Sequence, residues 1–252
     1  MVTGFEECGV NPEGVATTSG ADMAGSQTCG ASRGREARRA LVDREDMRAV
    51  YDAKPRAYKA IKRAADVLFS GGALLALSPV FLGTALAILI EDGRPVFYRS
   101  VRPGKDMRPF PMLKFRSMHK DADGRLEDLL DGNERDGAAF KIKDDPRITR
   151  VGAFIRKYSI DELPQLVNVL RGEMSLVGPR PIVPVQELTE HERQRAIVTP
   201  GLTCYWQVMG RTGIPWKDWV ELDLDYIQDM SILTDAKILV RTFGVVFRGE
   251  GS

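Results

Sequence analysis

One long apolar segment, interrupted in its middle, constrains this chain more than any other feature. Between Val67 and Ile90 the sequence has 24 residues without a charge, more than the roughly 20 that cross the apolar core of a bilayer. Ser78 and Pro79 lie near its centre, and a proline removes an intrahelical hydrogen bond and kinks or breaks a helix. We therefore predict a membrane segment made of two short half-helices.

Basic residues flank this segment on both sides. Lys59, Lys62 and Arg63 precede it, and Arg94 and Arg99 follow it. Positive charge favours the cytoplasmic side of a membrane, so this distribution favours a re-entrant segment with both ends in the cytoplasm. A kinked helix that crosses the membrane once has the same composition, because proline is common in such helices. The residues alone leave both topologies open.

The composition divides the chain into four regions. Residues 1–34 are rich in small residues and predict a disordered tail. Residues 35–63 predict a basic juxtamembrane helix, residues 64–92 the re-entrant membrane helix, and residues 93–252 a soluble domain. The apolar run begins too far from the N-terminus for a secretory signal. Three widely spaced cysteines and two histidines favour neither a disulfide framework nor a zinc site, so any metal is expected to have oxygen ligands.

The soluble region combines short extended runs with helical segments. Strands are predicted at Pro95–Tyr98, Phe110–Phe115, Ala138–Ile142 and Leu202–Val208, and helices at Asp121–Glu134, Val151–Lys157 and Ile160–Leu170. Strands and helices do not alternate regularly, which disfavours a doubly wound sheet. We expect an α+β fold, a helix-dominated domain with a small β-sheet.

The C-terminal segment Ile232–Arg248 is apolar with basic residues on one helical face. Lys237, Arg241 and Arg248 carry this charge. The pattern is typical of an amphipathic helix that lies on an anionic membrane surface. A core helix with a solvated basic edge has the same periodicity, so both interpretations stay open.

Two adjacent carboxylates, Asp161 and Glu162, are the strongest candidates for chemistry. They occur at an expected helix start, where Ser159 and Glu162 match the capping-box pattern that satisfies free backbone N–H groups. A structural cap is therefore one interpretation. The other follows from the neighbourhood, because Arg156 precedes the pair and a Gly-Pro-Arg-Pro turn containing Arg180 follows the same helix. A carboxylate pair between arginines can hold Mg²⁺ and phosphates together.

An aspartate in this position offers more than metal binding. An ionised Asp can attack a phosphoryl group and form an acyl phosphate, while the neighbouring Glu binds the metal. A helix N-terminus would keep Asp161 ionised and present backbone N–H groups to a phosphate. Other basic residues occur in turns, but each by itself is an ordinary surface charge: Lys114, Arg116 and Arg211.

A second acidic pattern suggests a different chemistry. Asp223 and Asp225 form a DxD sequence, which is compatible with a nucleotide-sugar glycosyltransferase that binds Mg²⁺. The same spacing also fits the solvated edge of a helix. The familiar nucleotide loops GxxxxGK[ST] and GxGxxG do not occur in the sequence.

Several longer blocks resemble one known family. They are the Ser78-Pro79 break and the segments PVFYRSVRPGKDMRPFPMLKFRSM, FKIKDDPRITRVGAFIRKYSIDELPQLVNVLRGEMSLVGPRP and TPGLTCYWQVMGRTG. In this order they are similar to the bacterial sugar transferase family, the monotopic phosphoglycosyl transferases that begin exopolysaccharide, capsule and O-antigen assembly. The resemblance extends from about residue 60 to the end of the chain.

The resemblance implies a reaction and assigns residues to it. A sugar 1-phosphate passes from a UDP-sugar to undecaprenyl phosphate with release of UMP, through a covalent enzyme intermediate. Asp161 matches the family's nucleophile and Glu162 its Mg²⁺-binding partner, and both carboxylates are candidate ligands of the metal. Basic residues of the matching blocks are expected to bind substrate: Arg156, Arg180, Lys114, Arg116 and Arg211.

The resemblance also implies a location. Ser78-Pro79 matches the family's helix-break-helix, which enters and leaves the cytoplasmic leaflet of the bacterial inner membrane without crossing it. No nucleic-acid partner is expected, and a homodimer is a further hypothesis. Larger relatives carry several membrane spans before this domain, so the chain is expected to be the catalytic core alone. The family's tryptophan-rich C-terminal segment here has the sequence DMSILTDAKIL.

Two other functions remain as alternatives. A glycosyltransferase that uses Asp223 and Asp225 would release UDP and form no covalent intermediate. A non-catalytic membrane scaffold would use Asp161 and Glu162 only to cap a helix. The sequence leaves the transferred sugar open, with glucose and galactose as first candidates.

Overall fold

The computed structural model describes residues 46–120, 122, 124, 145–182, 187–209 and 214–247. These residues form the following elements in chain order: α2 (Met47–Asp52), α3 (Arg56–Ala76), α4 (Ser78–Asp92), β1 (Phe97–Pro103), η1 (Lys105–Met107), β2 (Pro109–Phe115), α5 (Arg150–Lys157), η4 (Ile160–Glu162), α6 (Gln165–Arg171), β3 (Ser175–Val177), α7 (Glu190–Arg193), η5 (Gln194–Ile197), β4 (Gly201–Thr203), α8 (Tyr205–Met209), α9 (Trp216–Asp229) and α10 (Ile232–Phe247). Several predictions lie outside the described residues: the tail 1–34, the strand Ala138–Ile142, all but two residues of the helix Asp121–Glu134, and the side chains of Arg211 and Arg248.

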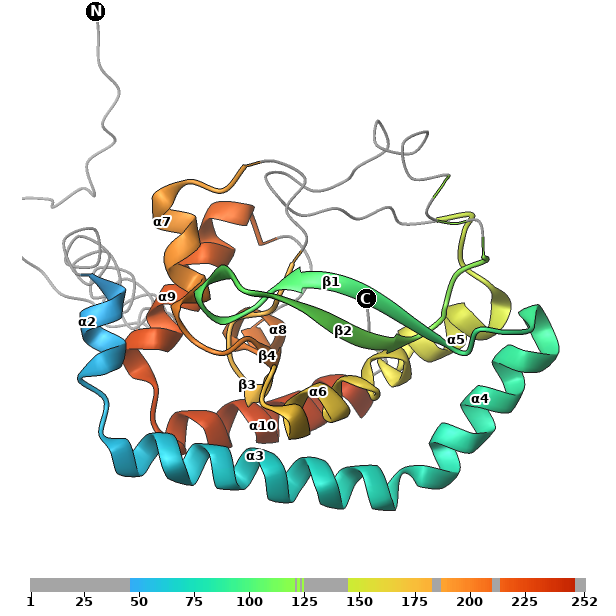
Figure 1. Ribbon diagram of the computed structural model, residues 1–252, viewed down its shortest axis with the longest axis horizontal. Helices are drawn as coiled ribbons and strands as arrows, with labels where there is room; N and C mark the ends of the chain where they lie inside the picture. The colour runs from blue at the N-terminus through green and yellow to red at the C-terminus, as the bar shows by residue number, and fades with distance from the viewer. Residues whose placement is uncertain are drawn as a thin grey trace, which may run out of the picture. The chain divides into compact units, whose positions relative to one another are not determined.

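Two helices joined by a sharp bend contain the apolar segment (Figure 1). α3 ends at Ala76 and α4 begins at Ser78, and their axes differ by 60°. Pro79 lies in the first turn of α4, where its missing N–H costs no intrahelical hydrogen bond. The Ser78 hydroxyl donates to the Leu75 carbonyl at 2.8 Å. The predicted helix break is confirmed.

The outer face of this helix pair is apolar. Its most exposed large side chains have between 64% and 86% of their surface accessible: Leu68, Phe69, Leu75, Leu82 and Ile90. Among the described residues no single helix is long and apolar enough to cross a bilayer, but α3 and α4 together have the length and composition of a broken span or a re-entrant loop.

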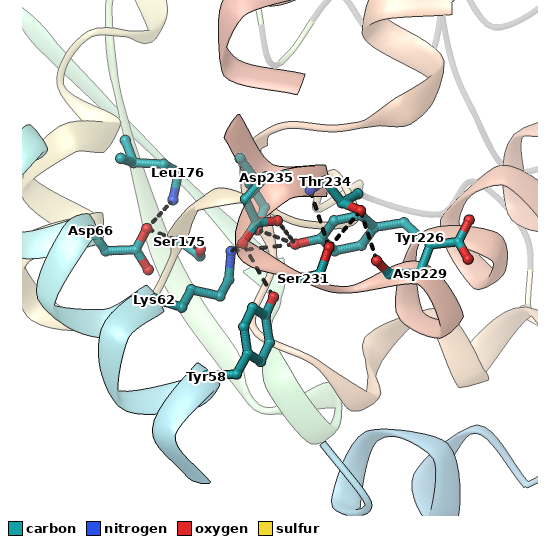
Figure 2. Close-up of polar contacts among 11 residues, drawn as sticks. Tyr58, Lys62, Asp66, Ser175, Leu176, Tyr226, Asp229, Ser231, Thr234 and Asp235 are labelled. Atoms are coloured by element: carbon teal, nitrogen blue, oxygen red, sulfur yellow. Dashed lines mark hydrogen bonds and ion pairs between the residues drawn. The ribbon is translucent and has the colours of Figure 1, made fainter. Parts of the chain in front are cut away.

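The first half of α3 contacts the helix α10 through one buried carboxylate, that of Asp235 (Figure 2). Asp235, in the first turn of α10, accepts hydrogen bonds from Lys62 Nζ at 2.9 Å, from the Tyr58 hydroxyl at 3.2 Å and from the Tyr226 hydroxyl at 2.8 Å. Burial and the Asp235 charge raise the pKa of both Tyr58 and Tyr226, so the two phenols stay protonated donors. The network joins α3, α9 and α10.

Two further contacts continue along α3 towards the bend. Asp66 accepts the Leu176 backbone N–H of β3 at 2.9 Å, and Arg63 donates to the Val169 and Leu170 carbonyls at the end of α6 at 2.6 and 2.7 Å. In the region 35–63, where one basic helix is predicted, the described residues form α2 and the start of α3 on either side of Pro55.

The strands form two separate pairs. β1 and β2 are antiparallel, in a register from Phe97 opposite Phe115 to Pro103 opposite Pro109. β3 and β4 are parallel. The prediction of a strand over Phe110–Phe115 is confirmed, whereas the first strand extends five residues beyond the predicted Tyr98. The two small sheets and the predominance of helices confirm the α+β class.

Two predicted elements are partly wrong. The extended run predicted over Leu202–Val208 becomes the short strand β4 followed by α8, in which Trp206 packs on Trp219 with ring centroids 4.1 Å apart. Tertiary packing of that ring outweighs the β propensity of the local sequence. The single helix predicted over Ile160–Leu170 is divided into η4 and α6, because Pro164 cannot donate the hydrogen bond that a continuous helix needs there.

Candidate active site

The two candidate carboxylates lie on the short 3₁₀ helix η4, between α5 and α6. Ser159 precedes them with φ of 55°, a left-handed conformation, and its side chain caps nothing. The capping box suggested by Ser159 and Glu162 is therefore not formed. The Glu162 side chain turns instead towards β2 and the Gly-Pro-Arg-Pro turn. The structural interpretation of the pair as a helix cap is wrong.

Two cations, Lys114 and Arg180, hold the Glu162 carboxylate. Its Oε1 accepts from Lys114 Nζ at 2.9 Å, and its Oε2 accepts from Arg180 Nη1 at 3.0 Å, with a second Arg180 contact to Oε1. Burial alone would raise its pKa, but the charges of Arg180 and Lys114 outweigh burial and hold the pKa of Glu162 well below its usual range. Both Glu162 oxygens are already bonded within the site.

Asp161 has the opposite environment. Only 4% of its surface is exposed, and its Oδ1 is buried without a hydrogen-bond partner. Burial, together with the negative charge of Glu162, raises the pKa of Asp161 to about 6, although Lys114, Arg156 and Arg180 oppose this shift. No α-helix begins at Asp161, because η4 spans only three residues, and desolvation raises the pKa of Asp161 where a helix N-terminus would lower it. An unpartnered carboxylate oxygen held near three cations, Lys114, Arg156 and Arg180, is suited to attack an electrophile or to bind a metal.

The β1–β2 pair and α6 place Lys114. Lys114 pairs with Tyr98 across the strands, and β2 is held against α6 by the Asn168 side chain. Asn168 Oδ1 accepts the Leu113 N–H at 2.9 Å, and its Nδ2 donates to the Pro111 carbonyl at 2.8 Å. The amide of Asn168 thus continues the hydrogen bonding of the outer edge of β2, and this fixes the strand that carries Lys114.

A close approach of two glycines places Arg180. A Cβ on Gly178 would lie 2.6 Å from the Thr199 carbonyl oxygen, and one on Gly201 would lie 2.1 Å from the Gly178 nitrogen. Any side chain at either position would push the β3–β4 pair apart. The Gly201 N–H donates to the Pro179 carbonyl at 2.9 Å. This hydrogen bond from β4 fixes the turn that carries Arg180.

Arg195 supports the same turn from the other side, and the sequence analysis missed it. Its Nη2 donates to the Arg180 carbonyl at 2.8 Å, and its Nε donates to Asp223 Oδ2 at 2.8 Å. Asp223 is fully buried in α9. The first carboxylate of the DxD pattern is therefore an internal partner of Arg195 and faces no solvent.

The remaining predicted site residues are divided between the site and other contacts. Arg156 lies in the last turn of α5, near enough for its charge to lower the pKa of Asp161 against burial. Arg116 lies elsewhere, since it pairs with Asp92 at 2.9 Å and donates to the Gly93 carbonyl at 2.7 Å. These contacts stabilise the C-terminal end of α4, and none of them involves Asp161 or Glu162.

A further cation, Arg102 of β1, was also missed. It lies on the face of β1 that carries Tyr98, and its charge environment includes Arg180 and Glu162. The sequence signal was the alternation of Tyr98, Ser100 and Arg102, which becomes visible only once the strand is known to run to Pro103.

The pair fits Mg²⁺ in one particular way. Within the described part of the chain, no cluster of three or more His, Cys, Asp or Glu side chains lies close enough to hold a metal. Mg²⁺ is commonly bound by one or two carboxylates together with the phosphates of a substrate. The unpartnered Oδ1 of Asp161 beside Glu162 fits that mode, and an all-protein cage is not formed by these residues.

Comparison with known proteins identifies the family. The model of the family described as "Bacterial sugar transferase" matches residues 57–249. The exopolysaccharide production protein ExoY of Sinorhizobium fredii is 41% identical over 197 residues, which cover 76% of this chain and 87% of ExoY.

Larger relatives match over part of their length. The undecaprenyl-phosphate galactose phosphotransferase of Salmonella typhimurium is 39% identical over 206 residues, 78% of this chain and 42% of that protein. The undecaprenyl-phosphate glucose phosphotransferase of Komagataeibacter xylinus is 43% identical over 194 residues, 72% of this chain and 35% of that protein. With a match over residues 57–249, the chain belongs to the bacterial sugar transferase family, as its sequence blocks predict.

Proposed function

We propose that this protein transfers a sugar 1-phosphate from a UDP-sugar to undecaprenyl phosphate, releases UMP and thereby begins the assembly of a bacterial polysaccharide. The names of the Salmonella and Komagataeibacter relatives support the lipid carrier and the phosphotransfer, and ExoY supports the role in exopolysaccharide production. The observation that carries the proposal is the buried, unpartnered Asp161 Oδ1 beside a carboxylate that two cations hold in place.

In the first step, an oxygen of ionised Asp161 attacks the phosphorus that bears the sugar. The bond from this phosphorus to the bridging oxygen breaks, and that oxygen leaves with UMP. An acyl phosphate now joins Asp161 to the sugar phosphate. Glu162 cannot replace Asp161 as the nucleophile, because both of its oxygens accept hydrogen bonds from Lys114 and Arg180. It positions these cations around the phosphates.

In the second step, a phosphate oxygen of undecaprenyl phosphate attacks the same phosphorus. The acyl phosphate bond breaks and returns the Asp161 carboxylate, and the product is the lipid diphosphate sugar. Mg²⁺, our proposed cofactor, would be held by Asp161 and Glu162 together with the substrate phosphates, and it would neutralise part of the phosphate charge. Arg156 and Arg180 contribute fixed positive charge near Asp161.

A lipid acceptor requires the site to lie at a membrane, and the helix pair supports a re-entrant anchor. The start of α3 is fastened to β3 and α10 through Asp66 and Lys62. The end of α4 is fastened to α5, because Glu91 accepts the Arg150 and Val151 backbone N–H groups at 2.9 and 3.0 Å. Both ends of the pair thus attach to the same compact domain, which favours entry and exit on one side.

The last helix supports the same membrane face. The predicted helix at the C-terminus is confirmed as α10. Ile238 is buried on its inner side, while Leu233 and Val240 are exposed together with Lys237 and Arg241. An outer surface that mixes apolar and basic side chains favours contact with an anionic membrane. We propose that the domain lies at the cytoplasmic face of the inner membrane, where UDP-sugars are available.

Identification of the nucleotide product tests this function. The full chain in nanodiscs would be given a panel of UDP-sugars with undecaprenyl phosphate, and UMP and UDP would be separated by chromatography. We expect UMP and, when the lipid is omitted, a sugar phosphate adduct on Asp161 in the mass spectrum. UDP as the product without an adduct would support the DxD glycosyltransferase. The burial of Asp223 against Arg195 argues against that alternative.

A further inference from the structure

Arg102 differs from the other cations around the carboxylate pair because it pairs with no carboxylate of the described residues. Lys114 and Arg180 both bond to Glu162. Arg102 donates from Nε to the Ser100 hydroxyl at 3.0 Å, and among the described residues it forms no ion pair with an acidic side chain. A largely buried guanidinium without an anion is unfavourable unless a ligand supplies one.

The strand geometry directs Arg102 towards the site. Tyr98, Ser100 and Arg102 occupy one face of β1, and Tyr98 lies opposite Lys114. The hydrogen bond to Ser100 turns the Arg102 side chain back along the strand towards the end where Lys114 contacts Glu162.

The electrostatics agree with this placement. Burial, together with the nearby positive charge of Arg180, lowers the pKa of Arg102 to about 10, although Tyr98 and Glu162 oppose this shift. Two guanidinium groups that repel each other in a half-buried position form a site for an anion with several oxygens. A guanidinium binds phosphate through two parallel hydrogen bonds.

We propose that Arg102 is a phosphate-binding residue which, together with Arg180, receives the phosphoryl group that is not bonded to Asp161 during the reaction. This inference rests on the proposed function. In the first step that phosphoryl group belongs to the departing UMP, and in the second step it belongs to undecaprenyl phosphate. Charge develops on the departing phosphate when the bridging bond breaks, and a fixed guanidinium stabilises that charge.

The test compares Arg102→Gln with Arg99→Gln. Arg99 lies on the same strand but on its exposed opposite face, so it is a matched control for a lost charge. Binding of UMP to the full chain in nanodiscs is measured by calorimetry, and the covalent adduct from UDP-sugar is followed without lipid. We expect Arg102→Gln to weaken UMP binding and slow adduct formation by about 10- to 100-fold, and Arg99→Gln to change each by less than about twofold.

The two steps separate the two sources of phosphate. If Arg102 serves the lipid phosphate only, UMP binding and adduct formation stay at the control level, while transfer from the preformed adduct to undecaprenyl phosphate slows. The proposal is overturned if neither step differs from Arg99→Gln. If Arg102→Gln does not fold, Arg102→Lys is tested in its place, because it keeps the charge and loses the paired donors. A UMP affinity of Arg102→Lys equal to that of the wild type would then refute the proposal. Absence of UMP and adduct in the wild type would instead refute the proposed function.

Discussion

The two acidic motifs of this chain, Asp161-Glu162 on η4 and Asp223-Leu224-Asp225 on α9, each begin with a buried aspartate, but the two aspartates differ in their contacts with cations. Burial raises the pKa of both Asp161 and Asp223 to about 6. The partners differ, because Asp223 shares its Oδ2 with the guanidinium of Arg195 inside the domain. Each aspartate also has a buried Oδ1 without a hydrogen-bond partner, but the cations beside Asp161 are directed to Glu162.

This difference separates a structural carboxylate from a candidate nucleophile. A perturbed pKa alone does not, since desolvation produces it at both positions. The more selective sign is that Lys114 and Arg180 pair with Glu162, so that among the described residues Asp161 has no ion pair of its own, whereas Asp223 pairs with Arg195. The motif on α9 also helps to position Arg180. Arg195, the partner of Asp223, donates a hydrogen bond to the Arg180 carbonyl.

Replacement of Asp161 by Asn should have the largest effect on activity. We expect UMP release to fall by at least about a thousandfold, as loss of a covalent nucleophile does, and the adduct to disappear. The raised pKa means that ionised Asp161 destabilises the fold at neutral pH, so the melting temperature should stay constant or rise. The matched control is Asp225→Asn, with near wild-type UMP release. An active Asp161→Asn protein with lowered stability would support the non-catalytic scaffold.

Replacement of Asp223 by Asn should have the largest effect on stability. It leaves the buried Arg195 without its counter-charge, and breaking such a pair costs about 3 to 5 kcal/mol in the free energy of unfolding. Urea denaturation in detergent micelles measures this value, with the half-buried Asp225→Asn as the control. A loss below about 1 kcal/mol for Asp223→Asn would mean that the pair does not support the fold, and the contrast with Asp161 would disappear.

The pH dependence of the first step sharpens the comparison. Asp161 attacks as the ionised carboxylate, so kcat/KM for the UDP-sugar should rise with pH until about 6 and then level off. Below that point we expect a change of about tenfold per pH unit. The UDP-sugar is the informative substrate, because a phosphate monoester such as the lipid has its own pKa near about 6.

A variant of the neighbouring residue tests which group causes this rise of kcat/KM with pH, the acidic limb of the profile. Glu162→Gln removes a negative charge that raises the pKa of Asp161, so the limb should move to lower pH even though the rate falls. A limb that stays at the same pH would show that another group controls it. A wild-type limb near 3.8, the ordinary value, would show that burial of Asp161 does not govern its ionisation.

Much of the site could be predicted because its residues lie in long recognisable blocks. Asp161, Glu162, Lys114 and Arg180 were identified, and the structure brings them together. The break at Ser78 was likewise predictable, since proline acts locally.

The residues that could not be predicted act through tertiary structure. Arg102 depends on strand pairing beyond Tyr98, and Arg195 depends on a contact with a carboxylate 28 positions away in α9. Arg116 matched a substrate-binding block, but its place at the end of α4 follows only from the fold. Local sequence patterns indicate which charged residues are candidates for the site, and tertiary packing decides which group each of them contacts.

The smallest expected effect concerns the cap that the sequence suggests and the structure lacks. Because the Ser159 side chain makes no cap hydrogen bond, Ser159→Ala should change the free energy of unfolding by less than about 0.5 kcal/mol. Thr149 is the matched control, since its hydroxyl accepts the Gly152 N–H at 2.8 Å at the start of α5. Thr149→Ala should cost about 1 kcal/mol in the same denaturation experiment. Equal losses for the two variants would restore the capping interpretation of Asp161 and Glu162 and weaken their separation from the motif on α9.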